Sequence, residues 1–141
     1  MAKISGLGAT VTIDDGAGSP QTITNDVTEF SMATPVALQD ITGVDKSAHE
    51  RLVLLADASF TLKGVFNTAS NMSHAVFKTV PAGATQTTRT SKIAPTASSG
   101  ASPYLTCELL FDDYAISRSS SGQLDWNVKG QLADGTVPSW S

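Results

Sequence analysis

The chain has 141 residues, the size of a single globular domain, and a formal net charge of −4. Charged residues make up only 16% of it, against an ordinary share of about 25%, while it contains 17 Ser and 17 Thr. This composition suits strands and turns, and the acidic balance argues against a protein that grips phosphate backbones through a basic surface.

Targeting and disulfide signals are missing from the sequence. The first residues have no apolar run of signal-peptide length, and no stretch of about 18 apolar residues occurs anywhere. We therefore expect neither a secretion signal nor a membrane span. The single cysteine, Cys107, cannot form an internal disulfide, which is compatible with a reducing cytoplasm.

Apolar and polar residues alternate in the first quarter of the chain, as they do in strands with one buried face. Residues 9–13 predict a first strand, and the Asp- and Gly-rich residues 14–20 predict a turn into a second strand at 21–24. A third strand is expected at 29–33, with Pro35 at its edge or end.

The most strongly patterned segment runs from 41 to 66. It begins with the charged piece 44–51 and continues into the apolar run 52–55. From Ala58 onward, apolar residues alternate with polar ones, and Asp57 falls on the polar side. This pattern predicts a long, half-buried antiparallel strand with one polar face.

Helical spacing replaces alternation after Asn67. Apolar residues then recur at intervals of three or four up to Thr79, which predicts one short helix that ends at Pro81 and Gly83. The next stretch, 82–102, consists mostly of Thr, Ser, Ala, Gly and Pro. Part of it is compatible with a strand, and most of it is expected to be a mobile loop.

Three further strands are expected at 105–111, 114–117 and 124–132, with a hairpin loop at 119–122. The chain is thus predicted to be mainly β, an antiparallel β-sandwich or barrel of seven or eight strands with one short flanking α-helix. We expect a single domain over 1–141, with a flexible N-terminal segment at 1–8.

Residues suited to catalysis or metal binding are scarce. The only histidines are His49, in the charged piece, and His74, in the predicted helix, and neither sits in a recognisable catalytic setting. Cys107 falls on the apolar side of its strand, where a buried, inert thiol is expected. We therefore expect no enzyme, no metal site and no cofactor.

Several stretches of the sequence together carry a family resemblance. They are 41–52 and 55–67, then Tyr114-Ala115-Ile116-Ser117-Arg118 with its Ser/Gly turn, 122–126, and 133–140. These stretches resemble the major tail tube proteins of long, non-contractile-tailed bacteriophages (the siphophage tail tube family). The predicted helix falls where such proteins have their single helix, and the resemblance extends over most of the chain apart from 82–102.

The resemblance implies a tail-tube-like structural virion protein that self-assembles into stacked hexameric rings. These rings form a tail tube, through which double-stranded DNA passes during ejection without specific binding. Assembly in the bacterial host cytoplasm is implied, as are tape measure, tail terminator and distal tail proteins as partners, with no membrane. Alternatives are another self-assembling β-rich virion component, such as a head decoration or head-tail joining protein, or the tube protein of a contractile injection system.

Two sets of residues are candidates for roles in such a tube. Because an acidic lumen would repel phosphates, we take Asp57 and Asp125 as better lumen-facing candidates than the acids in loops, with Lys63 and Lys129 also on polar strand faces. Mixed charges beside a long strand suit pairing between subunits. For both sets the alternative is ordinary solvated surface. The inter-subunit candidates are Asp45, Lys46, Glu50 and Arg51.

Overall fold

The computed structural model describes residues 5–96 and 103–141. Within these ranges the chain is mainly β, with antiparallel pairing throughout, as the sequence predicts. The elements are β1 (Thr10–Asp14), β2 (Pro20–Thr22), η1 (Thr24–Asp26), β3 (Val27–Ala33), β4 (Val36–Asp40), β5 (Arg51–Ala56), β6 (Ser59–Val65), α1 (Ser73–Phe77), η2 (Val80–Thr85), β7 (Arg89–Ala94), β8 (Leu105–Arg118), β9 (Leu124–Leu132) and β10 (Ser139–Trp140).

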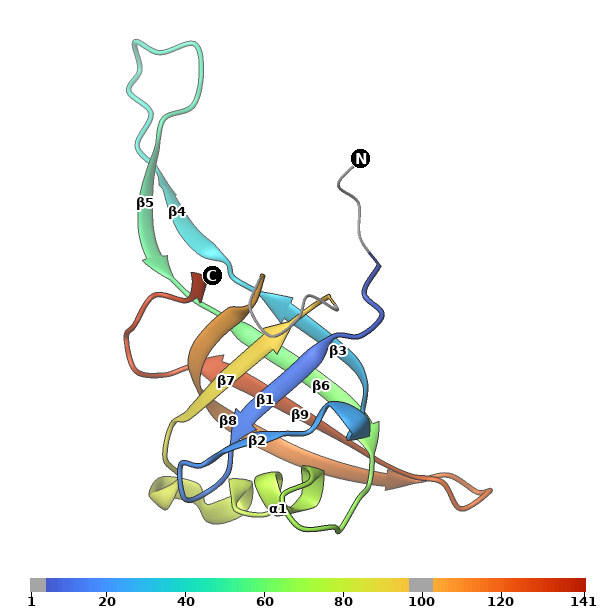
Figure 1. Cartoon of the computed structure of the whole chain (residues 1–141). Coiled ribbons are helices and arrows are strands. Elements are labelled where there is room, and N and C mark those ends of the chain that lie inside the picture. Colours follow the sequence, from blue (N-terminus) through green and yellow to red (C-terminus); the bar gives the residue numbers. More distant parts are fainter. Residues whose placement is uncertain (1–4, 97–102) are drawn as a thin grey trace.

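Eight of these strands form one sheet in the order β2-β1-β7-β8-β9-β6-β3, with β10 added to β8 (Figure 1). The long strand β8 belongs to two halves of this sheet. Its first half pairs with β7, and its second half pairs with β9 after a register shift between Phe111 and Asp113. The bulge lets one strand turn from one half of the sheet to the other. We call the eight-stranded sheet and its helical pieces the body.

The core lies between the two halves of the curved sheet, and α1 covers one end of it (Figure 1). The alternation predicted for 105–111 and 124–132 is confirmed, because Leu105, Leu109, Trp126 and Val128 are buried while their neighbours are not. The separate strand predicted at 114–117 is instead the second half of β8, and it does not alternate, since Ile116 is exposed. Phe77 of α1 joins this core, with its ring centroid 5.3 Å from that of Trp126. Aromatic packing therefore fixes the helix on the sheet.

Helix α1 is shorter than the sequence predicts, because its start is set by a residue far away in the chain. Asn67, after which the helical spacing begins, forms a local turn by accepting a hydrogen bond from the Ala69 N–H. The helix begins at Ser73, whose N–H donates to the buried carboxylate of Asp26 at 2.9 Å. Asp26 also accepts a hydrogen bond from the Asn67 side chain.

The Thr/Ser/Pro-rich stretch at 82–102 contains regular secondary structure where the sequence predicted a mobile loop over most of its length. The structure places η2 at its start and then β7, which lies inside the sheet between β1 and β8. Residues 97–102 lie outside the described residues, as do residues 1–4 of the expected flexible N-terminal segment, whereas residues 5–8 are described and exposed.

Arg89 opens β7 with its side chain buried in the body. Its guanidinium donates hydrogen bonds to the carbonyl oxygens of Asp14 and Val76 and to the hydroxyl of Thr79. Burial lowers the pKa of Arg89, while the charges of Asp15 and Asp14 act in the opposite direction. One polar side chain thus connects β7, β1 and the end of α1.

The long strand expected up to residue 66 is divided in two by Asp57 and Ala58. Its second part is β6, which alternates and lies in the body as predicted. Its first part, β5, pairs with β4 in a separate two-stranded sheet that projects from the body (Figure 1). We call this projection, 36–56, the hairpin arm.

Candidate assembly surfaces

The residue types that could serve in catalysis, Cys107 and His74, pack against other side chains of the fold. Within the described part of the chain, no group of three or more His, Cys, Asp or Glu side chains could hold a metal ion. Burial raises the pKa of the Cys107 thiol to about 11, so the thiol is protonated at neutral pH. His74 lies between Phe66 and Tyr114 and is 3.2 Å from the tyrosine hydroxyl.

In the described ranges, no helix is long and apolar enough to cross a bilayer.

A polar sheet face is the first candidate assembly surface. It extends over β3, β6, β9 and the second half of β8, whose core-facing residues alternate with exposed polar ones. Opposite charges lie side by side on it, because Glu29 is paired with Lys63, and Asp113 with Lys129. Cross-strand pairs of opposite sign stabilise a sheet and leave little net field.

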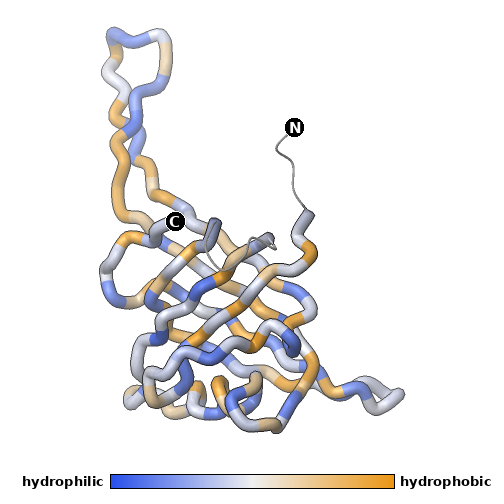
Figure 2. The backbone as a smooth tube through the Cα atoms, viewed as in Figure 1, coloured by the Kyte–Doolittle hydropathy of each residue, from blue (hydrophilic) through white to orange (hydrophobic). Residues whose placement is uncertain are grey.

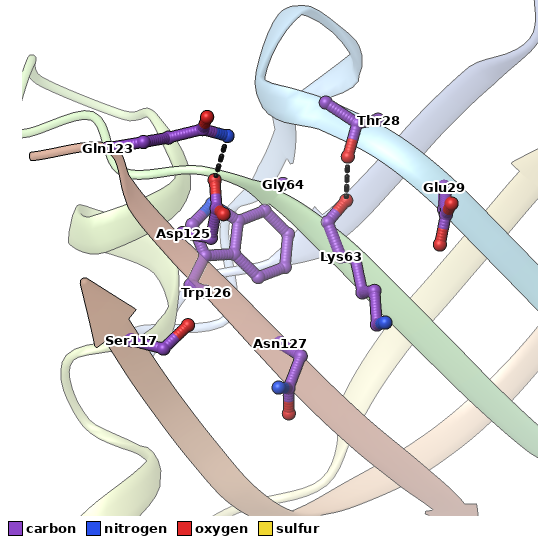
Figure 3. Close-up of a pocket in the computed structure, with 9 residues that line it drawn as sticks. All are labelled: Thr28, Glu29, Lys63, Gly64, Ser117, Gln123, Asp125, Trp126 and Asn127. Atoms are coloured by element: carbon purple, nitrogen blue, oxygen red, sulfur yellow. Dashed lines mark hydrogen bonds between the residues drawn. The ribbon is translucent and has the colours of Figure 1, made fainter. Parts of the chain in front are cut away.

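One end of this face has a hollow of about 280 Å³ that contains the lumen candidate Asp125 (Figure 3). The Asp125 carboxylate accepts a hydrogen bond of 2.9 Å from the Gln123 side chain. Gly64 and Trp126 lie at the hollow, and a Cβ atom on Gly64 would clash with the Asp26 carbonyl oxygen and lie 2.6 Å from the Trp126 ring. Glycine is therefore required where the tryptophan packs under the strand.

The second lumen candidate, Asp57, does not share this face. It lies in the link between β5 and β6, where its carboxylate accepts a hydrogen bond from the Ala58 N–H at 2.8 Å. Its surroundings include Val137 and Trp140, near the base of the hairpin arm. Asp125 pairs with Val65 at the other end of β6, about 20 Å away for a strand of this length. The structure thus separates the two predicted residues.

The polar face contains acids that sequence reasoning did not select. Lys63 and Lys129 lie on it as predicted, and both are exposed. Asp113 falls between the strands predicted at 105–111 and 114–117, yet it lies in β8 next to the bulge. Glu29 begins the strand predicted at 29–33, and its place on the polar side of that strand is the signal that could have identified it.

Two strand edges border the polar face and form the second candidate surface. β3 is paired on one side only, by β6. The second half of β8, from Asp112 to Arg118, is paired only by β9, because β7 and β10 reach no further than Leu109. Among the described residues no strand covers either edge. Unpaired N–H and C=O groups at such edges favour pairing with another chain.

The tip of the hairpin arm is the third surface, and it brings together the predicted inter-subunit residues. Lys46 lies 3.7 Å from Asp45 and 3.6 Å from Glu50, measured between nitrogen and carboxylate oxygen. Arg51 lies opposite Asp40 in the ladder. These pairs are exposed, so they add little stability to the single chain, and their side chains are accessible to a partner.

Below the tip, the hairpin arm exposes large apolar side chains along β4 and β5. Figure 2 shows this hydrophobic stretch beneath a hydrophilic tip. The exposed apolar residues of the arm are Val36, Leu38, Ile41, Val44, Leu52, Val53, Leu54 and Leu55. A patch of this kind marks a site of protein–protein interaction when it lies on a soluble domain.

Neither a protein-family model nor a curated protein matches this sequence. Solved structures do match its fold. The chain is similar to a subunit from the tail of an empty gene transfer agent (GTA) particle with C6 symmetry, at a TM-score of 0.75 and 15% identity over 99% of both chains. It is similar to the SPP1 tail tube, at a TM-score of 0.74 and 7% identity, over 99% of this chain and 80% of that one.

A third match, with a TM-score of 0.63 and 13% identity, is to the six-fold symmetrised baseplate of the anti-feeding prophage (AFP), over 100% of this chain and 95% of that one. At these identities the likeness shows the fold. The chain therefore has a tail-tube-like fold, and the resemblance inferred from its sequence is confirmed at that level.

Proposed function

We propose that this chain is a structural virion protein, the subunit of a tail tube that conducts DNA out of a phage-like particle. The observation that supports this most strongly is the pair of unpaired strand edges on either side of one polar sheet face, in a fold shared with the SPP1 tail tube. Such a subunit has what a ring requires: an edge to offer, an edge to accept, and a face to line the interior.

In the proposed ring, the β3 edge of one copy pairs with the Asp112–Arg118 edge of the next. This contact joins two different surfaces, so it repeats from copy to copy until a rotation closes it. The C6 symmetry of the GTA tail supports closure at six copies. Ring closure also removes both exposed edges, and with them the risk of irregular pairing.

The polar face then lines the lumen. Asp125 lies there with Glu29 and Asp113, and these three acids outnumber the two lysines, Lys63 and Lys129. Each lysine has an acid beside it, so phosphates meet no uncompensated cation and DNA slides without being held. Asp57 lies off this face, and we place it outside the lumen.

In the proposed tube, the hairpin arm contacts the neighbouring ring. Asp45, Lys46, Glu50 and Arg51 lie at its projecting end, where they can meet a neighbouring ring. A tail of this kind is assembled in the bacterial host cytoplasm, and tape measure, tail terminator and distal tail proteins are the partners that set its length and ends.

The tube protein of a contractile injection system is a second candidate, favoured by the match to the AFP baseplate. The higher TM-scores for the GTA tail and the SPP1 tail tube favour the phage tail tube. A head decoration or head-tail joining protein would differ in its assembly, as trimers, plates or single rings.

Electron microscopy of the concentrated protein, with light scattering to follow its mass, tests the proposal. We expect hollow tubes of stacked six-membered rings.

Single prolines placed in turn at 114–117 test the ring contact. Proline at a position whose N–H points away from β9 should leave the monomer folded by circular dichroism and abolish rings. Rings that survive every such proline would exclude the β8 edge from the contact.

A further inference from the structure

The hairpin arm exposes apolar side chains on both of its faces. The register pairs Leu38 with Val53 and Gln39 with Leu52. Because neighbouring residues of a strand point to opposite faces, Val53 and Leu38 share one face and Leu52 lies on the other. Val53 is 66% exposed, Leu38 58% and Leu52 50%. Both faces of the arm therefore expose large apolar side chains, whereas an ordinary solvent-facing side of a sheet is polar.

This distribution indicates burial on both sides. A strand with one face in solvent alternates apolar and polar residues, whereas a continuous apolar run such as Leu52-Val53-Leu54-Leu55 is typical of strands covered on both faces. Within the described chain, β4 and β5 pair only with each other. An isolated two-stranded hairpin is marginally stable in water, so the missing cover has to come from outside the chain.

The chemistry of the arm favours protein over lipid as that cover. Asp45, Lys46 and Glu50 lie at the end that would enter a bilayer first. The exposed fractions of their side chains are 76%, 48% and 47%. Charged groups at that depth are costly in hydrocarbon. A protein surface can accept both the apolar sides and the charged tip.

The two hollows described above, both formed by described residues, are too small to take the arm. The polar hollow beside Asp125, at about 280 Å³, has room for a few side chains. The apolar hollow beside Trp140 is smaller, at about 180 Å³. A docked ribbon on one flat surface buries one face and leaves the other in water. A crevice between two surfaces covers both.

We propose that the hairpin arm inserts between two copies of this chain, with the Val53 face against one copy and the Leu52 face against the other. This inference rests on the proposed function, since the tube supplies the two copies. It has a consequence for assembly order. The acceptor exists only where two subunits already stand side by side, so a ring accepts arms and a monomer does not. Rings must form before they stack.

Photo-crosslinking in assembled tubes tests this. The light-activated residue p-benzoylphenylalanine replaces Leu52, Val53 or both, and a small minority of probe-bearing chains is mixed with wild-type chains before assembly. Each single probe should yield covalent dimers, and the double probe should yield trimers of one probe-bearing and two wild-type chains. Mass spectrometry should find different acceptor peptides for the two positions. Irradiated monomer is the control and should yield no crosslinked product.

The outcomes separate the inference from the proposed function. Trimers in tubes support it. Tubes in which the double probe yields only dimers, or in which one position never crosslinks, would overturn the two-copy arrangement and leave the tube proposal standing. If the chain never forms tubes, alone or on an added tail initiation complex, the proposed function fails and this inference fails with it.

Discussion

Strands β5 and β6 follow each other in the chain and have opposite surroundings. Phe60 and Leu62 of β6 are fully buried in the body, whereas Leu52 and Val53 of β5 are half or more exposed. The difference lies in spacing: β6 alternates apolar and polar residues, and β5 does not. Alternation marks a strand that one chain can bury by itself. A continuous run marks a strand that is covered on both faces, and we propose that other copies supply the cover of β5.

If the body alone holds the chain folded, damage to its core should give the largest loss of stability. Phe77→Ala removes the ring that packs on Phe111 and Trp126. We expect a loss of about 3–5 kcal/mol in the free energy of unfolding, measured by urea denaturation. Phe77→Leu, the matched control, should lose much less. Equal losses for the two variants would contradict the role given to the ring stack.

Overpacking of the body should come next. Gly64→Ala places a methyl group against the Asp26 carbonyl oxygen and the Trp126 ring. We expect a loss of about 1–3 kcal/mol by the same measurement, with a change in tryptophan fluorescence as the ring shifts. Gly6→Ala is the control, because its new Cβ meets only ordinary contact at 3.6 Å from Pro95. Wild-type stability of Gly64→Ala would show that the strand shifts freely there.

The hairpin arm should behave in the opposite way, with assembly lost and stability kept. Val53→Ser changes an exposed side chain, so the free energy of unfolding should stay within about 0.5 kcal/mol of wild type. Tube formation, followed by light scattering and electron microscopy, should fall sharply. Val53→Ile keeps the apolar contact and should assemble. Normal tubes from Val53→Ser would remove this face of the arm from the interface.

The smallest effect concerns pH close to the tip of the hairpin arm, where Asp40 lies opposite Arg51. Hydrogen bonds from the Thr42 hydroxyl and N–H, then from His49, hold the pKa of Asp40 below its ordinary value of 3.8. Since the folded-state pKa is the lower one, this stabilisation is present above 3.8 and is lost as pH falls through the folded value. The protection of the Thr42 and Glu50 amides from exchange, relative to the intrinsic rate at each pH, should fall over that range.

Asp40→Asn is the matched variant, because it keeps the side-chain shape and removes the titrating group. Its amides should lack the acid-dependent change seen at Thr42 and Glu50 in the wild type. An identical acid profile in both proteins would assign the change to another group.

Much of the body could be predicted from sequence because its strands alternate, but three features lacked a local signal. Strand β7 buries Arg89 and Ser91 on the side where apolar residues are expected, so its pattern is masked. The start of α1 depends on Asp26, distant in the chain. Strand β5 lies outside the body, and in our proposal its cover comes from other copies. For the candidate site, Asp125 lies on the polar strand face where the sequence placed it. Asp57 was expected in the same long strand as β6, but it lies in the link between β5 and β6.

Strand β8 has a mechanical consequence in a closed ring. A tube under internal pressure carries tension around its circumference, and in the proposed ring that tension passes from subunit to subunit through the free half of β8. The other half of the same strand is paired with β7 and, at its start, with β10, and its pairing with β9 begins at Leu109. A load at the seam is thus transmitted to the interior of the fold, and a seam cannot peel open at β8 without also loading the core of its subunit.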